Sequence, residues 1–193
     1  YLGRLVTSPP PLGLTRTNGN PALEQFIAWL DARGELHGAE MARHYAKASL
    51  LGAEVELPGP VGEQNNYSLH PRGRIMLLAQ TPGGLLEQMA AILATGNRGT
   101  AEGHPLPDQL PPAVAKVFTP DPAEPFSAAL VEGDEDRVSA AIAWASTLPG
   151  PIVSVHAARR GQTTAYDLQW LLEEVSVSTN TTAAGGNASL MTI

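Results

Sequence analysis

The chain has no cysteine, which excludes disulfide bonds, thiolate metal sites and a cysteine nucleophile. It is also poor in positive charge: 12 Lys and Arg face 19 Asp and Glu, and no basic run is longer than Arg159-Arg160. The resulting net charge of −7 argues against a surface that neutralises nucleic-acid phosphates. No apolar run approaches the roughly 20 residues that span a bilayer. The first residues also lack the basic-then-apolar order of a signal peptide.

The residues that are present are typical of a folded protein, since 43% are hydrophobic and 16% charged. Residues 1–20 contain SPPPLGL and TNGN, so we interpret them as a proline-rich linker or surface segment from the middle of a longer chain. Residues 21–66 are predicted to form a helical preface. Asn20 can cap a helix that begins at Pro21, and a second helix is expected over residues 38–51, before a break at residues 56–66. The apolar stripe of the first helix comprises Leu23, Phe26, Ile27 and Leu30.

From Tyr67 the pattern changes to short apolar runs that alternate with amphipathic stretches. This alternation predicts βαβ units and a parallel sheet covered on both faces. We therefore predict an α/β fold with a Rossmann-like core over residues 67–179. The expected strands are residues 74–79, 115–119, 126–132, 150–157 and 175–179, and the expected helices cover residues 86–93, 133–147 and 166–174. The stripe expected on the second of these helices is Val138, Ala141, Ile142 and Ala145.

The residues contain no visible catalytic constellation. The first strand-to-helix turn, LLAQTPGGLLEQ, holds Gly83-Gly84 without the G-x-G-x-x-G spacing of a dinucleotide site, so a tight turn is favoured over an anion site. The five histidines share no ligand spacing. The acidic run at residues 132–137 is best explained as a solvated helix N-terminus, and Glu173 and Glu174, adjacent on an expected helix, point apart. We predict no catalytic, cofactor-binding or metal-binding residue.

Several segments resemble known families. PRGRIMLLA and AAILATGN, within residues 71–103, resemble the first strand and helix of the cofactor domain of the aldehyde dehydrogenase superfamily. LPGPVGEQNNYSLHPRGR, LPGPIVSVHA and LLEEVSVSTNTTAAGGNASLMTI are similar to the C-terminal region of the proline utilization A family, the bifunctional bacterial flavoenzymes of proline catabolism. Together these segments reach from about residue 56 to residue 193.

The resemblance implies a parent that couples an FAD-dependent proline dehydrogenase to an NAD-dependent glutamate-semialdehyde (pyrroline-5-carboxylate) dehydrogenase through an internal tunnel. Long members carry an additional C-terminal domain with the aldehyde dehydrogenase fold and no activity, and this chain resembles that domain. The cofactor lysine position, five residues after Asn97, holds Glu102, and the oxyanion asparagine position falls at Ala79 or Gln80. The cysteine required for the thiohemiacetal is absent. FAD and NAD are thus expected in the parent and no cofactor in this chain.

We expect the end of the chain to be a docking motif that lies against the semialdehyde dehydrogenase domain, of the same or a partner chain, and covers the tunnel. Val175, Val177 and Thr179 alternate as an edge strand that can extend another sheet. Two alternatives remain: a vestigial nucleotide-binding regulatory module at Gly83-Gly84, or mainly an oligomerisation domain in a homodimer. A cytoplasmic location is expected, with a parent peripheral at the inner membrane as an option. The motif comprises Asn180, Thr181, Gly185, Gly186, Asn187, Ser189, Leu190, Met191 and Ile193.

Overall fold

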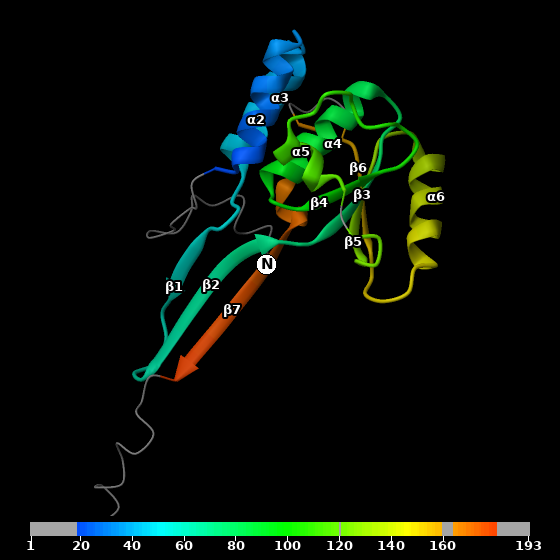
Figure 1. The fold of residues 1–193 in the computed structure, drawn as a ribbon. Helices are drawn as coiled ribbons and strands as arrows, with labels where there is room; N and C mark the ends of the chain where they lie inside the picture. Colours follow the sequence, from blue (N-terminus) through cyan, green and yellow to red (C-terminus); the bar gives the residue numbers. More distant parts are fainter. Residues whose placement is uncertain (1–18, 120, 160–163, 181–193) are drawn as a thin grey trace, which may run out of the picture.

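The computed structural model of the chain describes residues 19–119, 121–159 and 164–180. These residues form a body, built on a parallel sheet, from which an antiparallel arm projects (Figure 1). Nearly all of the proline-rich start and residues 181–193 of the predicted docking motif lie outside the described residues.

The parallel sheet of the body has the strand order β4-β3-β5-β6. Helix α4 (Pro82–Ala94) follows β3 (Arg74–Leu78) and leads to β4 (Arg98–Ala101), while α6 (Glu135–Ser146) follows β5 (Phe126–Val131) and leads to β6 (Ser154–Ala157). The two helices lie on opposite sides of the sheet (Figure 1). Because the chain leaves β3 toward one edge and β5 toward the other, its direction switches between these two neighbouring strands. The predicted α/β fold with a Rossmann-like parallel sheet is confirmed.

The main hydrophobic core lies between α4 and the face of the sheet that carries Ile75, Leu77, Ala128 and Leu130, all fully buried. Helices α2 (Pro21–Ala32) and α3 (Leu36–Ala48) pack against α4 from outside, which explains why α4 is apolar around most of its circumference. The other face of the sheet is covered more thinly. On α6, Ala141 and Ala145 are buried as predicted. Ile142, which was expected in the same apolar stripe, is instead 54% exposed.

Polar side chains fix the start of α2, as the sequence predicts, and the end of α4. The Asn20 side chain accepts a hydrogen bond from the Ala22 N–H at 3.0 Å, which confirms the expected cap of α2. After α4, the Asn97 side chain accepts from the Gly73 N–H at 2.8 Å and donates to the Leu171 carbonyl at 2.7 Å. The AAILATGN segment is therefore a structural joint that holds the end of α4 to the two chain segments at the base of the arm.

The arm is a separate sheet with the order β1-β2-β7, all antiparallel. Its strands are β1 (Glu54–Leu57), β2 (Glu63–Pro71) and β7 (Leu172–Asn180), and a single 3-10 turn, η1 (Leu168–Leu171), leads into β7. Leu69 and Leu172 pack with Ala53 in a small cluster at the base of the arm, while all eight residues of β7 that follow Leu172 are exposed or half-buried. Strand β7 is an edge strand within the described residues, as the sequence predicts for Val175 and Val177.

Three secondary-structure predictions are wrong. Residues 115–119 are not a strand, because Pro111 and Pro112 start helix α5 (Pro112–Val117), whose Val114 packs into the core. Residues 166–174 are not a helix: only η1 is helical, and the strand begins at Leu172 rather than at residue 175. Residues 56–66 are not simply a break, because they contain the end of β1, the turn and the start of β2. The sequence did not indicate these strands because they are rich in Glu and Asn, which have low β-propensity. Strand β4 was not predicted at all.

Candidate functional site

The first candidate site lies at the carboxyl ends of β3 and β5, where the chain direction switches, and we call this switch point the crevice. Open α/β sheets bind ligands at this place, and helix N-termini supply N–H groups to phosphates there. Helices α4 and α6 both begin at this edge, and Thr81 and Asp134 cap them through bonds to the N–H groups of Gly84 and Arg137. The fold thus places the crevice where a nucleotide would be expected.

Glu132 fills this crevice from within. It follows β5 directly, and its carboxylate accepts hydrogen bonds from the N–H groups of Gln80 at 2.7 Å and Thr81 at 2.8 Å and from the Thr81 hydroxyl at 2.7 Å. A Cβ atom added at Gly84 would lie 1.9 Å from one carboxylate oxygen, so only glycine leaves room for the carboxylate at the start of α4. The donors that could bind a phosphate are therefore used by the chain itself.

Arg137 closes the other side of the crevice. Its guanidinium donates to the Glu132 carbonyl at 2.8 Å and to the Ala79 carbonyl at 2.9 Å, and so ties the start of α6 to the end of β3. Burial by itself would raise the pKa of Glu132, but the hydrogen bonds from Thr81 and Gln80 and the nearby Arg137 together lower it below its ordinary value. The carboxylate is thus ionised at neutral pH. The first turn of α6 adds Glu135 and Asp136, which further disfavour a bound anion.

The positions compared with the aldehyde dehydrogenase superfamily border the same crevice. Ala79 is buried, and Gln80 is exposed, with its carbonyl 2.9 Å from Nε2 of His104. Glu102 lies exposed just after β4. The interpretation of the acidic run as a solvated helix N-terminus is right for Asp134 and wrong for Glu132, which binds the start of another helix. Sequence reasoning missed this contact because the partners are 51 and 52 residues apart.

The described residues contain neither a cluster of metal ligands nor a membrane-spanning helix. Among them, no group of three or more His, Asp or Glu side chains could hold a metal ion. His156 stacks on Trp170 at 6.1 Å between ring centroids, and burial and the positive charge of Arg72 lower its pKa. In the part of the chain that is described, no helix is long and apolar enough to cross a bilayer.

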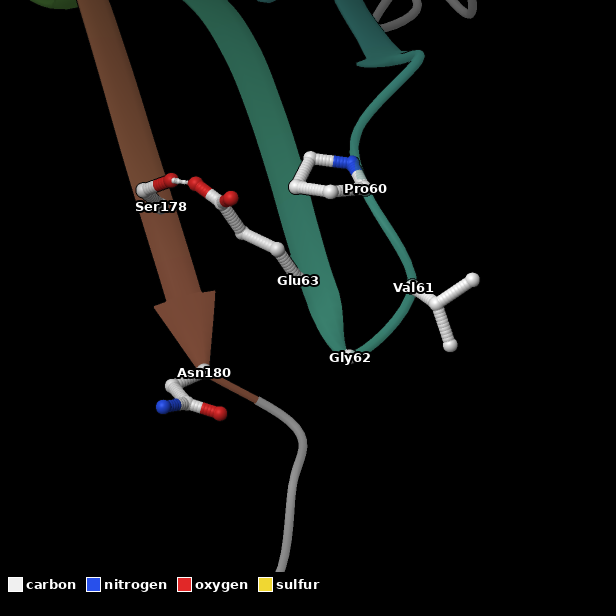
Figure 2. A pocket seen from close by; sticks show the side chains of 6 residues that line it. All are labelled: Pro60, Val61, Gly62, Glu63, Ser178 and Asn180. Atoms are coloured by element: carbon white, nitrogen blue, oxygen red, sulfur yellow. Dashed lines mark hydrogen bonds between the residues drawn. The ribbon is translucent and has the colours of Figure 1, made fainter.

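The second candidate site is the outer edge of β7. Asn180, the first residue of the predicted docking motif, ends this strand opposite Glu63. With Pro60, Val61 and Ser178 it lines a hollow of about 460 Å³ at the tip of the arm (Figure 2). The Ser178 hydroxyl donates a hydrogen bond to the Glu63 carboxylate across the two strands. Val61 is fully exposed at the tip, and Val177 on β7 is 51% exposed.

The arm is also strongly acidic. Its three strands contain five glutamates and neither lysine nor arginine, against a net charge of −7 for the whole chain. Tyr67 lies on the same face as Glu174, and burial and this carboxylate raise the pKa of its phenol to about 12. Glu173 and Glu174 point to opposite faces, as predicted, although they do so on a strand rather than on a helix. The glutamates of the arm are Glu54, Glu56, Glu63, Glu173 and Glu174.

The switch-point sheet, the crevice filled by Glu132 and the projecting arm define a Rossmann-like α/β domain with an exposed strand edge. No family model matches the chain. The chain is 45% identical over its full length to the bifunctional protein PutA of Rhizobium meliloti and 39% identical to that of Salmonella typhimurium, and it spans 17% and 16% of these proteins. It is homologous to the C-terminal region of PutA, which confirms the predicted resemblance to the proline utilization A family.

The solved structures agree on the fold. Over 71% of the chain, a structure of proline utilization A with proline bound in remote sites gives a TM-score of 0.52 at 20% identity, and the match covers 19% of that structure. Over 86% of the chain, proline utilization A from Corynebacterium freiburgense gives a TM-score of 0.50 at 18% identity, covering 15% of that structure. At these identities the likeness supports the fold alone.

Proposed function

We propose that this chain is a non-catalytic C-terminal domain of a bifunctional proline-oxidising enzyme. Its role is to stabilise the assembly and to cover the substrate-channelling tunnel beside the semialdehyde dehydrogenase domain. The single observation that carries this proposal is the open edge of β7, which continues into the docking motif at Asn180. An exposed strand edge is a template for pairing with another sheet. FAD and NAD would be cofactors of the parent enzyme, which we expect in the cytoplasm.

The crevice supports the non-catalytic part of the proposal. Its residues do not fit a dinucleotide, because the Glu132 carboxylate uses the N–H groups of Gln80 and Thr81, and a pyrophosphate would meet a second carboxylate at the start of α6. Glu102 stands where the resemblance implies a lysine, so the edge of β4 adds negative rather than positive charge. The alternative of a nucleotide-binding regulatory module is therefore disfavoured.

The proposed function is tested in the full-length parent by deleting residues 180–193. Proline oxidation by the first active site should remain nearly unchanged, whereas NADH formation from proline should slow and show a lag as the intermediate escapes. Coupled turnover at the wild-type rate with no lag would refute the tunnel-covering role. An oligomerisation role predicts instead that the deletion dissociates a dimer in sedimentation while channelling within each chain persists.

A further inference from the structure

The charges on the arm indicate what kind of strand β7 accepts. We propose that the outer edge of β7 receives an extended segment of a separate domain, with two consecutive basic residues opposite Glu173 and Glu174 and β-branched residues opposite Val175 and Val177. This inference rests on the proposed function, because it assumes that β7 is a docking edge. It adds the chemistry of the partner, which the homology does not supply.

The two glutamates lack a cationic partner in the described chain. On β2, the residues opposite Glu173 and Glu174 are His70 and Leu69. The three ion pairs within the described ranges lie in the body and join Arg43 to Asp31, Arg98 to Glu124 and Arg159 to Asp167. Because neighbouring strand residues point to opposite faces, two consecutive basic residues on an incoming strand would place one cation beside each glutamate.

The two valines likewise lack apolar neighbours across the sheet. Val175 and Val177 share one face of β7, and β2 places Ser68 and Asn66 opposite them. Val177 is 51% exposed. A β-branched residue on the other side of each valine would complete a cross-strand apolar pair, the type of contact that stabilises sheets. The base of this edge therefore suits basic residues of an incoming strand, and the part nearer the tip suits apolar residues.

Charge complementarity selects a separate basic segment over a second copy of the arm. Two arms paired through β7 would bring together ten glutamates without a lysine or arginine on any of the six strands, twice the content of one arm. Like charges gathered on one sheet are destabilising, while opposite charges across strands are favourable. The occupant is therefore a strand with a positively charged end.

The test uses the full 193-residue chain and a nine-residue peptide, Lys-Lys-Val-Thr-Val-Thr-Val-Lys-Lys, whose symmetry suits parallel and antiparallel pairing. The control peptide has glutamate at each lysine position. Heteronuclear NMR titration should show that the lysine peptide binds at β7, that binding weakens at roughly 0.3 M NaCl, and that the glutamate peptide does not bind. Glu173→Gln with Glu174→Gln should weaken binding by about tenfold, the size of two cross-strand charge pairs.

The matched control is Glu54→Gln with Glu56→Gln, which removes two charges from β1 on the far side of the same arm. It should weaken binding by less than about twofold. Equal losses in the two double variants, binding of the glutamate peptide, or no binding of either peptide would overturn the proposal. Self-association in sedimentation that the lysine peptide fails to compete would also overturn it, in favour of a second copy.

Failure of this inference is distinguishable from failure of the proposed function. If deletion of residues 180–193 impairs coupled NADH formation but the lysine peptide does not bind, docking stands and the basic partner is wrong. If the peptide binds β7 but the deletion leaves coupling intact, the edge chemistry stands and the tunnel-covering role is wrong.

Discussion

The carboxyl edge of the parallel sheet and the outer edge of β7 both present groups that a ligand or partner could use, but they differ in how these groups are satisfied. At the sheet edge, Glu132 and Arg137 bind the exposed ends of β3 and α4 from within. On the arm, neither Glu173 nor Glu174 has an ion-pair partner among the described residues, and the residues of β2 opposite the two valines are polar. The carboxylate at the sheet edge is thus satisfied within the chain, whereas we propose that the carboxylates of β7 are satisfied by a partner strand.

This difference predicts that substitutions in the two regions will have different effects. A polar group that is hydrogen-bonded within the fold contributes to the stability of the chain. A polar group that is paired only across an interface contributes to the affinity for the partner. Changes in the crevice should therefore alter the stability of the chain, while changes along β7 should alter docking and leave stability nearly constant. The predictions below test this separation, beginning with the largest effect.

The largest effect is expected for Gly84→Ala, which places a methyl group 1.9 Å from a Glu132 carboxylate oxygen and must displace it. We expect it to lower the free energy of unfolding by about 2 kcal/mol. In the background of Glu132→Ala the same change should be neutral or slightly stabilising, because alanine is a better helix former than glycine. Urea denaturation of the four proteins gives this coupling as a double-mutant cycle.

Gly83→Ala is the matched control for this cycle, because a Cβ atom at Gly83 would meet nothing within 4 Å. It should be neutral or stabilising in both backgrounds. A cost of Gly84→Ala that is the same with and without Glu132 would show that the carboxylate does not fill the crevice in solution.

Glu132→Gln should have the next largest effect, because it keeps the shape of the side chain but removes the charge. We expect a loss of about 1 to 2 kcal/mol at pH 7, reduced from the value for a fully buried group by solvent screening. The lowered pKa of Glu132 stabilises the fold above the ordinary carboxyl pKa, and this contribution is lost as pH falls through the folded-state value. The variant should therefore lose less stability than the wild type on acidification, as measured by thermal unfolding at successive pH values.

Asp136→Asn tests whether this pH effect is specific to the crevice. Asp136 lies exposed in the first turn of α6, away from the carboxylate that binds the start of α4. Its substitution should change stability by less than about 0.5 kcal/mol and leave the acid limb parallel to that of the wild type. A similar flattening in both variants would indicate an effect of net charge.

The sequence predicts the body better than the arm for a physical reason. Helices α2, α4 and α6 carry local signals, since Asn20, Thr81 and Asp134 cap them and apolar residues recur at helical spacing. Residues 166–174 show the same spacing, but Leu168 and Leu171 are buried by one 3-10 turn and Leu172 already belongs to β7. Four apolar positions do not determine a period, and the pairing of β7 with β2 across about a hundred residues decided the outcome.

The crevice and the edge differ in the same way. Gly83-Gly84 marks the turn before α4 in the sequence, but the anion that occupies it comes from the end of β5, and only the sheet order brings them together. The edge character of β7 follows from the local alternation of Val175 and Val177, so it could be predicted without knowing its partner strand. Local sequence patterns predict which interactions a segment can make, and the topology determines whether another part of the same chain supplies the partner.

On the arm, Glu173→Gln with Glu174→Gln should change the free energy of unfolding by less than about 0.5 kcal/mol, because neither glutamate has an ion-pair partner within the described residues. Urea denaturation checks this directly. A loss above about 1 kcal/mol would mean that these charges support the fold and would remove the contrast between the two edges.

The smallest effect concerns Tyr67, whose pKa of about 12 reflects burial first and the Glu174 carboxylate second. Glu174→Gln removes the negative charge that disfavours the phenolate, so the pKa of Tyr67 should fall toward 10, while burial keeps it above that value. Burial also raises the pKa of Tyr45 and Tyr166, so neither interferes with an ultraviolet difference titration of the variant against the wild type. Tyr67→Phe should abolish the difference. Because a raised phenol pKa stabilises the fold below pH 10 and loses this effect as pH rises toward 12, Glu174→Gln should also shift the start of alkaline unfolding slightly.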